Sequence, residues 1–105
     1  MQVIPTEITE VKEIRPVRHH DARGFFSEIF RDSVLRENGI AATFVQENHS
    51  LSMDDGVVRG LHFQIPPMSQ AKLVRVAVGS IFDVAVDIRS GSPTFGRHVA
   101  LILSA

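Results

Sequence analysis

An alternation of apolar side chains between residues 73 and 88 constrains the fold of this chain more than any other feature. Val74, Val76 and Val78 occupy every second position ahead of Gly79-Ser80, and behind it the same spacing is kept by Phe82, Val84, Val86 and Ile88. A period of two places such side chains on one face of a strand, and Gly-Ser between two such runs is typical of a tight turn. We therefore predict a β-hairpin over residues 72–89.

The remainder of the chain is predicted to be largely β as well. Pro5 and Pro16 discourage a helix near the N-terminus, so we expect one or two edge strands before residue 18. Alternating or aromatic runs predict further strands, and polar runs with glycine or proline predict the turns. The expected strands are 25–30, 43–52, 57–65 and 97–103, and the expected turns are 19–24, 53–56 and 90–94.

One short helix is expected among these strands. Asp32 or Ser33 can serve as its N-cap, Val34 and Leu35 supply apolar contacts, and Asn38-Gly39 is a typical terminator in the left-handed conformation.

Many short strands joined by polar turns indicate a sandwich or a barrel-like jelly roll. The strand pattern runs to Ala105 without a closing element, which would leave an apolar edge unpaired. We therefore predict an all-β jelly roll with one short helix, in which residues 1–105 form a single partial domain truncated before the closing strands.

Composition excludes several classes of protein. Apolar residues make up 44% of the chain and charged residues 22%, which are ordinary values for a folded domain, and the formal net charge is −1. This balance gives no reason to expect binding to nucleic acid or to an anionic membrane. The chain has no cysteine and no apolar run long enough to span a bilayer, so we expect a cytoplasmic protein.

Three charged or titratable side chains could carry chemistry. His62 stands in an apolar run as either a structural histidine or a general base, and the pattern alone does not decide between the two. Lys72 opens another apolar run, where it either caps the strand in water or stabilises a negative oxygen. Glu28, between two phenylalanines, lies either on an aromatic face or at a solvated edge.

A protein metal site is not expected. Residues 62–64 read His-Phe-Gln, with one imidazole where a His-x-His pair would be needed, and His19-His20 are neighbours in a predicted loop.

Ordered motifs give the chain a family resemblance. They read DARGFFSE at 21–28, FVQENHS at 44–50, RGLHFQ at 59–64, QAKLVRV at 70–76 and DVAVDIRSGSPTFG at 83–96. In this order they resemble the signatures of dTDP-4-dehydrorhamnose 3,5-epimerases, which carry Asp where this chain has Glu47.

The resemblance implies a cofactor-free isomerase with a cupin-type jelly roll. It implies a homodimer with exchanged N-terminal strands and conversion of dTDP-4-keto-6-deoxyglucose to dTDP-4-keto-L-rhamnose, in dTDP-L-rhamnose biosynthesis. His62 resembles the catalytic base and Lys72 the cation that stabilises the enolate. Arg59 is similar to a diphosphate or substrate contact, and the other implied substrate-binding residues are Arg23, Phe26, Glu28, Gln46 and Asn48.

The resemblance also leaves alternatives open. In the family the catalytic acid is a tyrosine and an aspartate holds the base, and both follow the region matched here, whereas this chain has no tyrosine. Asp83 or Asp87 could orient His62 instead, although strand parity does not show that either reaches it. A related single-carbon epimerase, a ketoisomerase of sugar nucleotides, or a catalytically silent fragment for sugar-nucleotide binding or dimerisation remain alternative functions.

Overall fold

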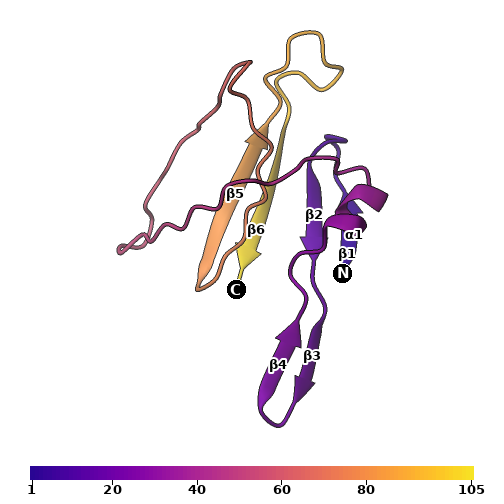
Figure 1. The fold of residues 1–105 in the computed structure, drawn as a ribbon. Coiled ribbons are helices and arrows are strands. Elements are labelled where there is room, and N and C mark those ends of the chain that lie inside the picture. The colour runs from indigo at the N-terminus through magenta and orange to yellow at the C-terminus, as the bar shows by residue number, and fades with distance from the viewer. The chain divides into compact units, whose positions relative to one another are not determined.

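The computed structural model describes residues 1–105 as strands, turns and one short helix (Figure 1). The elements are β1 (Gln2–Pro5), β2 (Lys12–Arg15), β3 (Arg18–Asp21), β4 (Gly24–Ser27), α1 (Asp32–Glu37), β5 (Ser80–Val86) and β6 (His98–Ser104). The chain divides into two compact units, one made of residues 1–41 and 75–105 and the other of residues 42–74. All seven elements belong to the first unit.

The N-terminal strands form two antiparallel hairpins. β1 pairs with β2 in a register that places Val3 opposite Ile14, which confirms the predicted edge strands. β3 pairs with β4 and places His19 opposite Phe26, so two histidines expected in a turn belong to a strand. The turn is shorter than predicted because the Asp21 carboxylate accepts a hydrogen bond from the Arg23 amide at 2.8 Å, which closes the chain locally.

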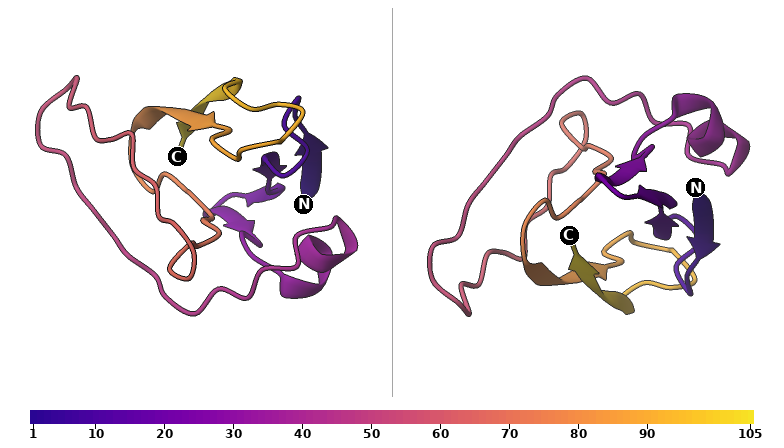
Figure 2. Two further views of the ribbon diagram at one scale, coloured as in Figure 1. Left: turned by 90° about the horizontal axis from the view of Figure 1, so that it is seen from above. Right: turned by 90° about the horizontal axis from the view of Figure 1, so that it is seen from below.

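The last strands correct the predicted hairpin. β5 is a strand as expected, but its antiparallel partner is β6, with Val84 opposite Ala100, and residues 72–78 form no strand. Figure 2 shows β5 and β6 as a two-stranded ribbon in both views. Alternation shows which side chains share a face, but it carries no information about which strand lies alongside. Ser80 is instead the first residue of β5 and pairs with Ser104, so the predicted Gly79-Ser80 hairpin turn is wrong.

The helix lies where it was predicted and has a different N-cap. Arg31 is the N-cap and has no capping side chain, whereas Asp32 lies in the first turn, where its carboxylate pairs with Arg36 at 2.7 Å. At the other end Gly39 has φ +80, and its amide and that of Ile40 donate to the carbonyls of Arg36 and Leu35. These two bonds form a Schellman motif, which confirms the predicted stop at Gly39.

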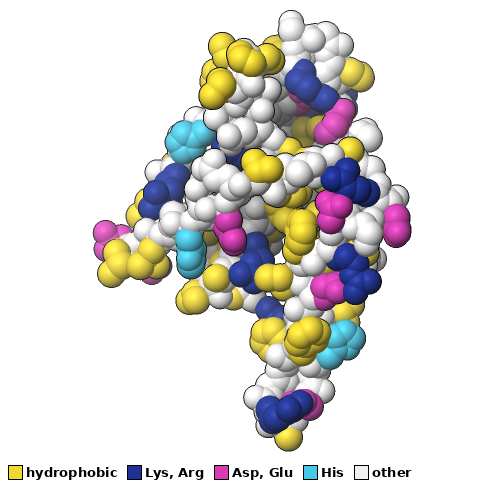
Figure 3. Space-filling model, in the orientation of Figure 1, with side chains coloured by type: hydrophobic (Ala, Val, Ile, Leu, Met, Phe, Trp, Pro, Cys, Tyr) yellow, Lys and Arg dark blue, Asp and Glu magenta, His cyan; other side chains and the backbone are white.

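The second unit, residues 42–74, contains turns but no strand. Strands predicted at 43–52 and 57–65 are absent, while the turn ending at Gly56 is present with φ +76. A strand requires hydrogen bonds to a neighbour and packing of its apolar face. Here Val45 is 90% exposed and Val58 89%, so these apolar side chains lack packing partners. Hydrophobic side chains accordingly form many of the protrusions in the space-filling view (Figure 3).

Buried apolar side chains are few. Ile8 is 3% exposed and Leu35 2%, and they are the only buried hydrophobic residues. The first unit must therefore rely on polar contacts for much of its organisation.

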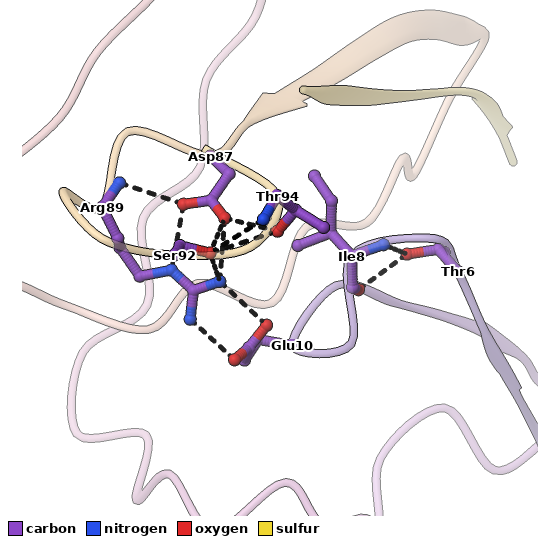
Figure 4. A network of polar contacts seen from close by, with 7 residues as sticks. All are labelled: Thr6, Ile8, Glu10, Asp87, Arg89, Ser92 and Thr94. Carbon is purple, nitrogen blue, oxygen red and sulfur yellow. Dashed lines mark hydrogen bonds and ion pairs between the residues drawn. The ribbon is translucent and has the colours of Figure 1, made fainter. Parts of the chain in front are cut away.

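The carboxylate of Asp87 is the centre of the main polar network (Figure 4). Its side chain is 1% exposed and accepts hydrogen bonds from the hydroxyls of Ser92 and Thr94, each at 2.6 Å. Arg89 donates to it from its backbone amide at 3.0 Å and from its guanidinium at 3.0 and 2.9 Å. The loop between β5 and β6 is thus folded around one negative charge.

Arg89 joins this loop to the N-terminal hairpin. Its Nη1 and Nη2 atoms lie 2.6 and 3.1 Å from the two carboxylate oxygens of Glu10, in the turn between β1 and β2. The same turn is closed by Thr6, whose hydroxyl donates to the carbonyls of Ile8 and Val11. A bidentate ion pair therefore connects Glu10 and Arg89, which are 79 positions apart in the sequence.

The network shifts the ionisation of its members. Hydrogen bonds from Arg89, followed by those from Ser92 and Thr94, hold the pKa of Asp87 far below its usual range. Asp87, followed by Glu10, raises the pKa of Arg89, and Arg89 lowers the pKa of Glu10.

We predict that Ser92→Ala destabilises the first unit. The substitution removes a donor to a desolvated carboxylate, which should lower Tm on the order of 5 °C in a chain of this size. Ser90→Ala is the matched control, because Ser90 lies exposed in the same loop outside the network. Thermal unfolding followed by circular dichroism checks the difference, and equal Tm values for the two variants would contradict it.

Acid should weaken the Asp87 network. Since the pKa of this carboxyl is lower in the folded than in the unfolded chain, its stabilisation is present above an unfolded pKa of about 4 and is lost as pH falls toward the folded value. Asp87→Asn should be less stable at neutral pH and should lose less free energy of unfolding between about pH 5 and about pH 2.5. Urea titrations at stepped pH measure both quantities, with Asp83→Asn as the control that keeps the acid response.

Candidate functional site

Two of the candidate substrate-binding residues line one hollow in the first unit. Phe26 and Glu28 are two positions apart, and with four other residues they surround an open hollow of about 400 Å³. The other lining residues are Met1, Val17, His19 and Arg31. Phe26 is 73% exposed, and Nη2 of Arg31 donates to Oε2 of Glu28 at 2.5 Å. The hollow offers an accessible aromatic ring beside a carboxylate whose charge is balanced.

Arg23 lies at the tip of the β3–β4 hairpin and is bound to Asp21. Its Nη2 atom is 2.6 Å from Oδ2 of Asp21, and the Arg23 side chain is 90% exposed. The pair lowers the pKa of Asp21 and raises the pKa of Arg23, through the hydrogen bonds between the two side chains. An anionic ligand at Arg23 would therefore bind beside the Asp21 carboxylate or displace it.

The opposite face of this hairpin holds a second cluster, which was not predicted from the sequence. There the guanidinium carbon of Arg18 lies 4.6 Å from the ring centroid of Phe25, and the ring of His20 lies 5.7 Å from it. The signal was available, because residues 18 and 20 share a face of one strand and Phe25 is paired with His20. Arg31 was missed as well, although it stands three residues after Glu28.

The second unit contains the remaining candidates apart from Asp83. Gln46 and Asn48 contact each other, with Nε2 of Gln46 donating to Oδ1 of Asn48 at 3.1 Å. Arg59 donates to the Ser52 hydroxyl at 3.2 Å and to the Leu51 carbonyl at 3.1 Å. Two polar pairs in this unit are therefore oriented by short-range hydrogen bonds.

His62 and Lys72, the predicted base and cation, are exposed. Neither side chain makes a hydrogen bond or an ion pair within the chain, in contrast to Arg23, Arg59 and Arg89. Both side chains are therefore accessible to a ligand.

The two aspartates considered as partners of His62 differ in their engagement. Both carboxylate oxygens of Asp87 accept hydrogen bonds within the loop that follows β5. Asp83 is half-buried in β5 opposite Leu101 and makes no side-chain hydrogen bond. Asp83 is therefore the aspartate of the two with a free carboxylate, and its contact with His62 stays a prediction.

Metal-ligating residues do not gather anywhere in the structure. No group of three or more His, Cys, Asp or Glu side chains could hold a metal ion. Separately, none of its helices has the length and apolarity needed to cross a membrane.

Comparison with known proteins extends the resemblance along almost the whole chain. A family model described as dTDP-4-dehydrorhamnose 3,5-epimerase matches residues 5–105. A relative of that name from Sinorhizobium fredii is 55% identical over 97 residues, covering 92% of this chain and 50% of its own length. The one from Shigella flexneri is 54% identical and is matched over 100% of this chain and 58% of its own length. The chain thus spans about half the length of the curated relatives it matches.

Solved structures agree with the sequence comparison. The epimerase of Bacillus anthracis, with TDP and PPi bound, superposes with a TM-score of 0.94 at 46% identity, covering 98% of this chain and 59% of that one. The Legionella pneumophila enzyme in complex with dTDP-4-keto-L-rhamnose gives a TM-score of 0.90 at 52% identity, covering 98% and 54%. The predicted fold class is confirmed as all-β and cupin-type with one short helix. The chain belongs to the dTDP-4-dehydrorhamnose 3,5-epimerase family.

Proposed function

We propose that this chain carries the catalytic base and the oxyanion-stabilising cation of a cofactor-independent isomerase, a dTDP-4-dehydrorhamnose 3,5-epimerase. The observation that carries the proposal is the match of 92% or more of the chain, at 54 to 55% identity, to relatives of that name. The substrate is dTDP-4-keto-6-deoxyglucose and the product is dTDP-4-keto-L-rhamnose, which the Legionella pneumophila structure contains.

The reaction needs little beyond acid–base groups. The ketone at C4 acidifies the hydrogens on C3 and C5, so His62 can remove a proton from either carbon while the electron pair moves onto the ketone oxygen. The ammonium of Lys72 stabilises the resulting enolate oxygen because its interaction strengthens as negative charge develops. Both side chains are exposed, so each is accessible to a substrate.

Inversion needs a second proton donor on the opposite face of the sugar. The resemblance assigns that role to a tyrosine, and the sequence contains none. We assign only the base and the cation to residues 1–105. A related epimerase acting at one carbon or a ketoisomerase would share these two groups, whereas a silent binding fragment would use neither. The number of carbons that take up solvent deuterium distinguishes these alternatives.

Each unit is proposed to provide substrate contacts of its own. Arg59 provides a guanidinium for the diphosphate, held in place by Ser52 and Leu51. The hollow beside Phe26 and Glu28 provides an aromatic surface and a hydrogen-bond acceptor. Gln46, Asn48 and Arg23 are further proposed contacts.

We also propose a homodimer in which N-terminal strands are exchanged. The β3–β4 hairpin supports this idea, because Phe25 is 56% exposed on the face opposite Phe26 and would be covered by a second subunit. A cytoplasmic location is proposed from the absence of cysteine and from the sugar-nucleotide substrate.

His62→Ala should abolish proton exchange. We would test it in a chimera that joins residues 1–105 to the remaining part of the Shigella flexneri relative, incubated with the keto sugar in heavy water. Loss of the base should reduce deuterium uptake about 10²- to 10⁴-fold. His98→Ala, at an exposed histidine of β6, is the control. Undiminished uptake at both carbons in His62→Ala would sink the assignment.

Lys72→Ala should act mainly on kcat. Because the ammonium contact strengthens in the transition state, kcat should fall about 10²- to 10³-fold with a smaller change in KM. Steady-state kinetics of the same chimera measures both constants, and Lys12→Ala replaces the only other lysine as a control. A pure rise in KM would make Lys72 a binding residue.

A further inference from the structure

Arg31 lines the hollow in the first unit but has no role in the function proposed above. Its Nη2 atom donates to Oε2 of Glu28 at 2.5 Å, and both side chains lie around the hollow that also contains the exposed ring of Phe26. Glu28 and Phe26 were expected to bind substrate, whereas Arg31 was not. The hollow thus places a cation of unassigned function against a carboxylate that is expected to contact the substrate.

The ion pair engages one oxygen of Glu28 and leaves the other free. Oε2 accepts the hydrogen bond from Arg31, whereas Oε1 makes no hydrogen bond within the chain. A carboxylate bound through one oxygen is restricted in orientation, and its second oxygen remains an acceptor for an N–H or O–H group of a ligand. Without Arg31, no contact within the chain would fix this carboxylate or balance its charge.

Arg31 is itself held in place by the helix. It is the N-cap of α1, and its carbonyl accepts the hydrogen bond of the Leu35 amide at 3.2 Å. Leu35 is 2% exposed, so burial of its side chain anchors the first turn of the helix. The guanidinium therefore reaches Glu28 from a backbone that α1 fixes.

The charge of Glu28 matters because the proposed ligand is an anion. A dTDP sugar carries a diphosphate, which an unbalanced carboxylate in its binding surface would repel. The side chains of Arg31 and Glu28 are 59% and 39% exposed, so their ion pair contributes little to the stability of the fold. Its larger effect is expected on ligand binding.

We propose that Arg31 is a positioning residue for Glu28, which balances the charge of the carboxylate and holds it with Oε1 free for a donor group of the substrate. The proposal rests on the proposed function of the hollow as a substrate-binding surface. Arg31 acts through Glu28 and touches none of the reacting atoms, so it affects the affinity for substrate and leaves the chemical step unchanged.

Arg31→Gln in the His62→Ala chimera tests the proposal without turnover. Calorimetric titration with dTDP-4-keto-6-deoxyglucose should show a Kd raised about 5- to 20-fold, because the carboxylate loses its partner and repels the diphosphate. In the parent chimera the same change should appear in KM, with kcat changed less than about threefold.

Arg36→Gln is the matched control for this titration. Arg36 is another exposed arginine, paired with Asp32 at 2.7 Å, and it lies outside the hollow. Its substitution should leave Kd within about twofold of the original value. Equal Kd values for Arg31→Gln and Arg36→Gln would overturn the proposal.

A lysine substitution and thermal unfolding separate positioning from a structural role. Because one nitrogen of Arg31 makes the contact, Arg31→Lys keeps a charged donor and should hold Kd within about threefold of the original value. Arg31→Gln should lower Tm by less than about 2 °C, since an exposed ion pair adds little stability. A lysine variant that binds as weakly as the glutamine variant, or a fall in Tm on the order of 5 °C, would overturn the proposal.

A double-mutant cycle with Glu28→Gln tests whether Arg31 acts through Glu28. Once the carboxylate is removed, Arg31→Gln should change Kd less than about threefold. An equal loss of affinity in both backgrounds would mean that Arg31 binds the ligand directly, and the proposal would be wrong. A failure of the proposed function would appear separately, as undiminished deuterium exchange in His62→Ala.

Discussion

The carboxylate of Asp87 organises the first unit more than any apolar contact does. It accepts five hydrogen bonds, and its backbone carbonyl and amide bond to Gly96 and Arg97, which starts the ladder between β5 and β6. Through Arg89 the same charge is coupled to Glu10 and so to the turn between β1 and β2. Only Ile8 and Leu35 are buried among the hydrophobic residues, so this network provides most of the buried side-chain contacts described in the first unit. A buried carboxylate is tolerated because every oxygen is satisfied.

Local features could be predicted from the sequence, and strand partners could not. Alternation located β5 and β6, and Gly39 ended α1 where glycine is favoured. The predicted partner of β5 was wrong, because β5 pairs with β6. The loop that joins these two strands is closed by Asp87, at the C-terminal end of β5, and the residues Gly79-Ser80 give no information about that loop. Residues 43–52 and 57–65 have strand composition, yet exposed Val45 and Val58 show that composition yields a strand only where a neighbour completes the ladder.

The identities of the candidate site residues were more predictable than their contacts. Motif order singled out Phe26 and Glu28, and the structure places both on one hollow. Motif order did not indicate that Arg31 would pair with Glu28 or Asp21 with Arg23, because both pairs depend on local backbone geometry outside the strand period. Charged side chains make several competing contacts of similar energy, so their partners depend on local backbone placement that a one-dimensional pattern lacks.

Asp87 and Arg89 differ from His62 and Lys72 in the number of hydrogen bonds that their side chains make within the chain. Asp87 and Arg89 form hydrogen bonds that hold the fold together. These bonds lower the pKa of Asp87 and raise the pKa of Arg89, so both side chains stay charged and do not transfer protons at neutral pH. His62 and Lys72 are exposed and make no such contacts. A base must be able to gain and release a proton in each turnover, so a histidine committed to the fold would be a poor one. Stability in this chain is accordingly concentrated in the loop after β5, while the residues proposed for catalysis contribute little to it.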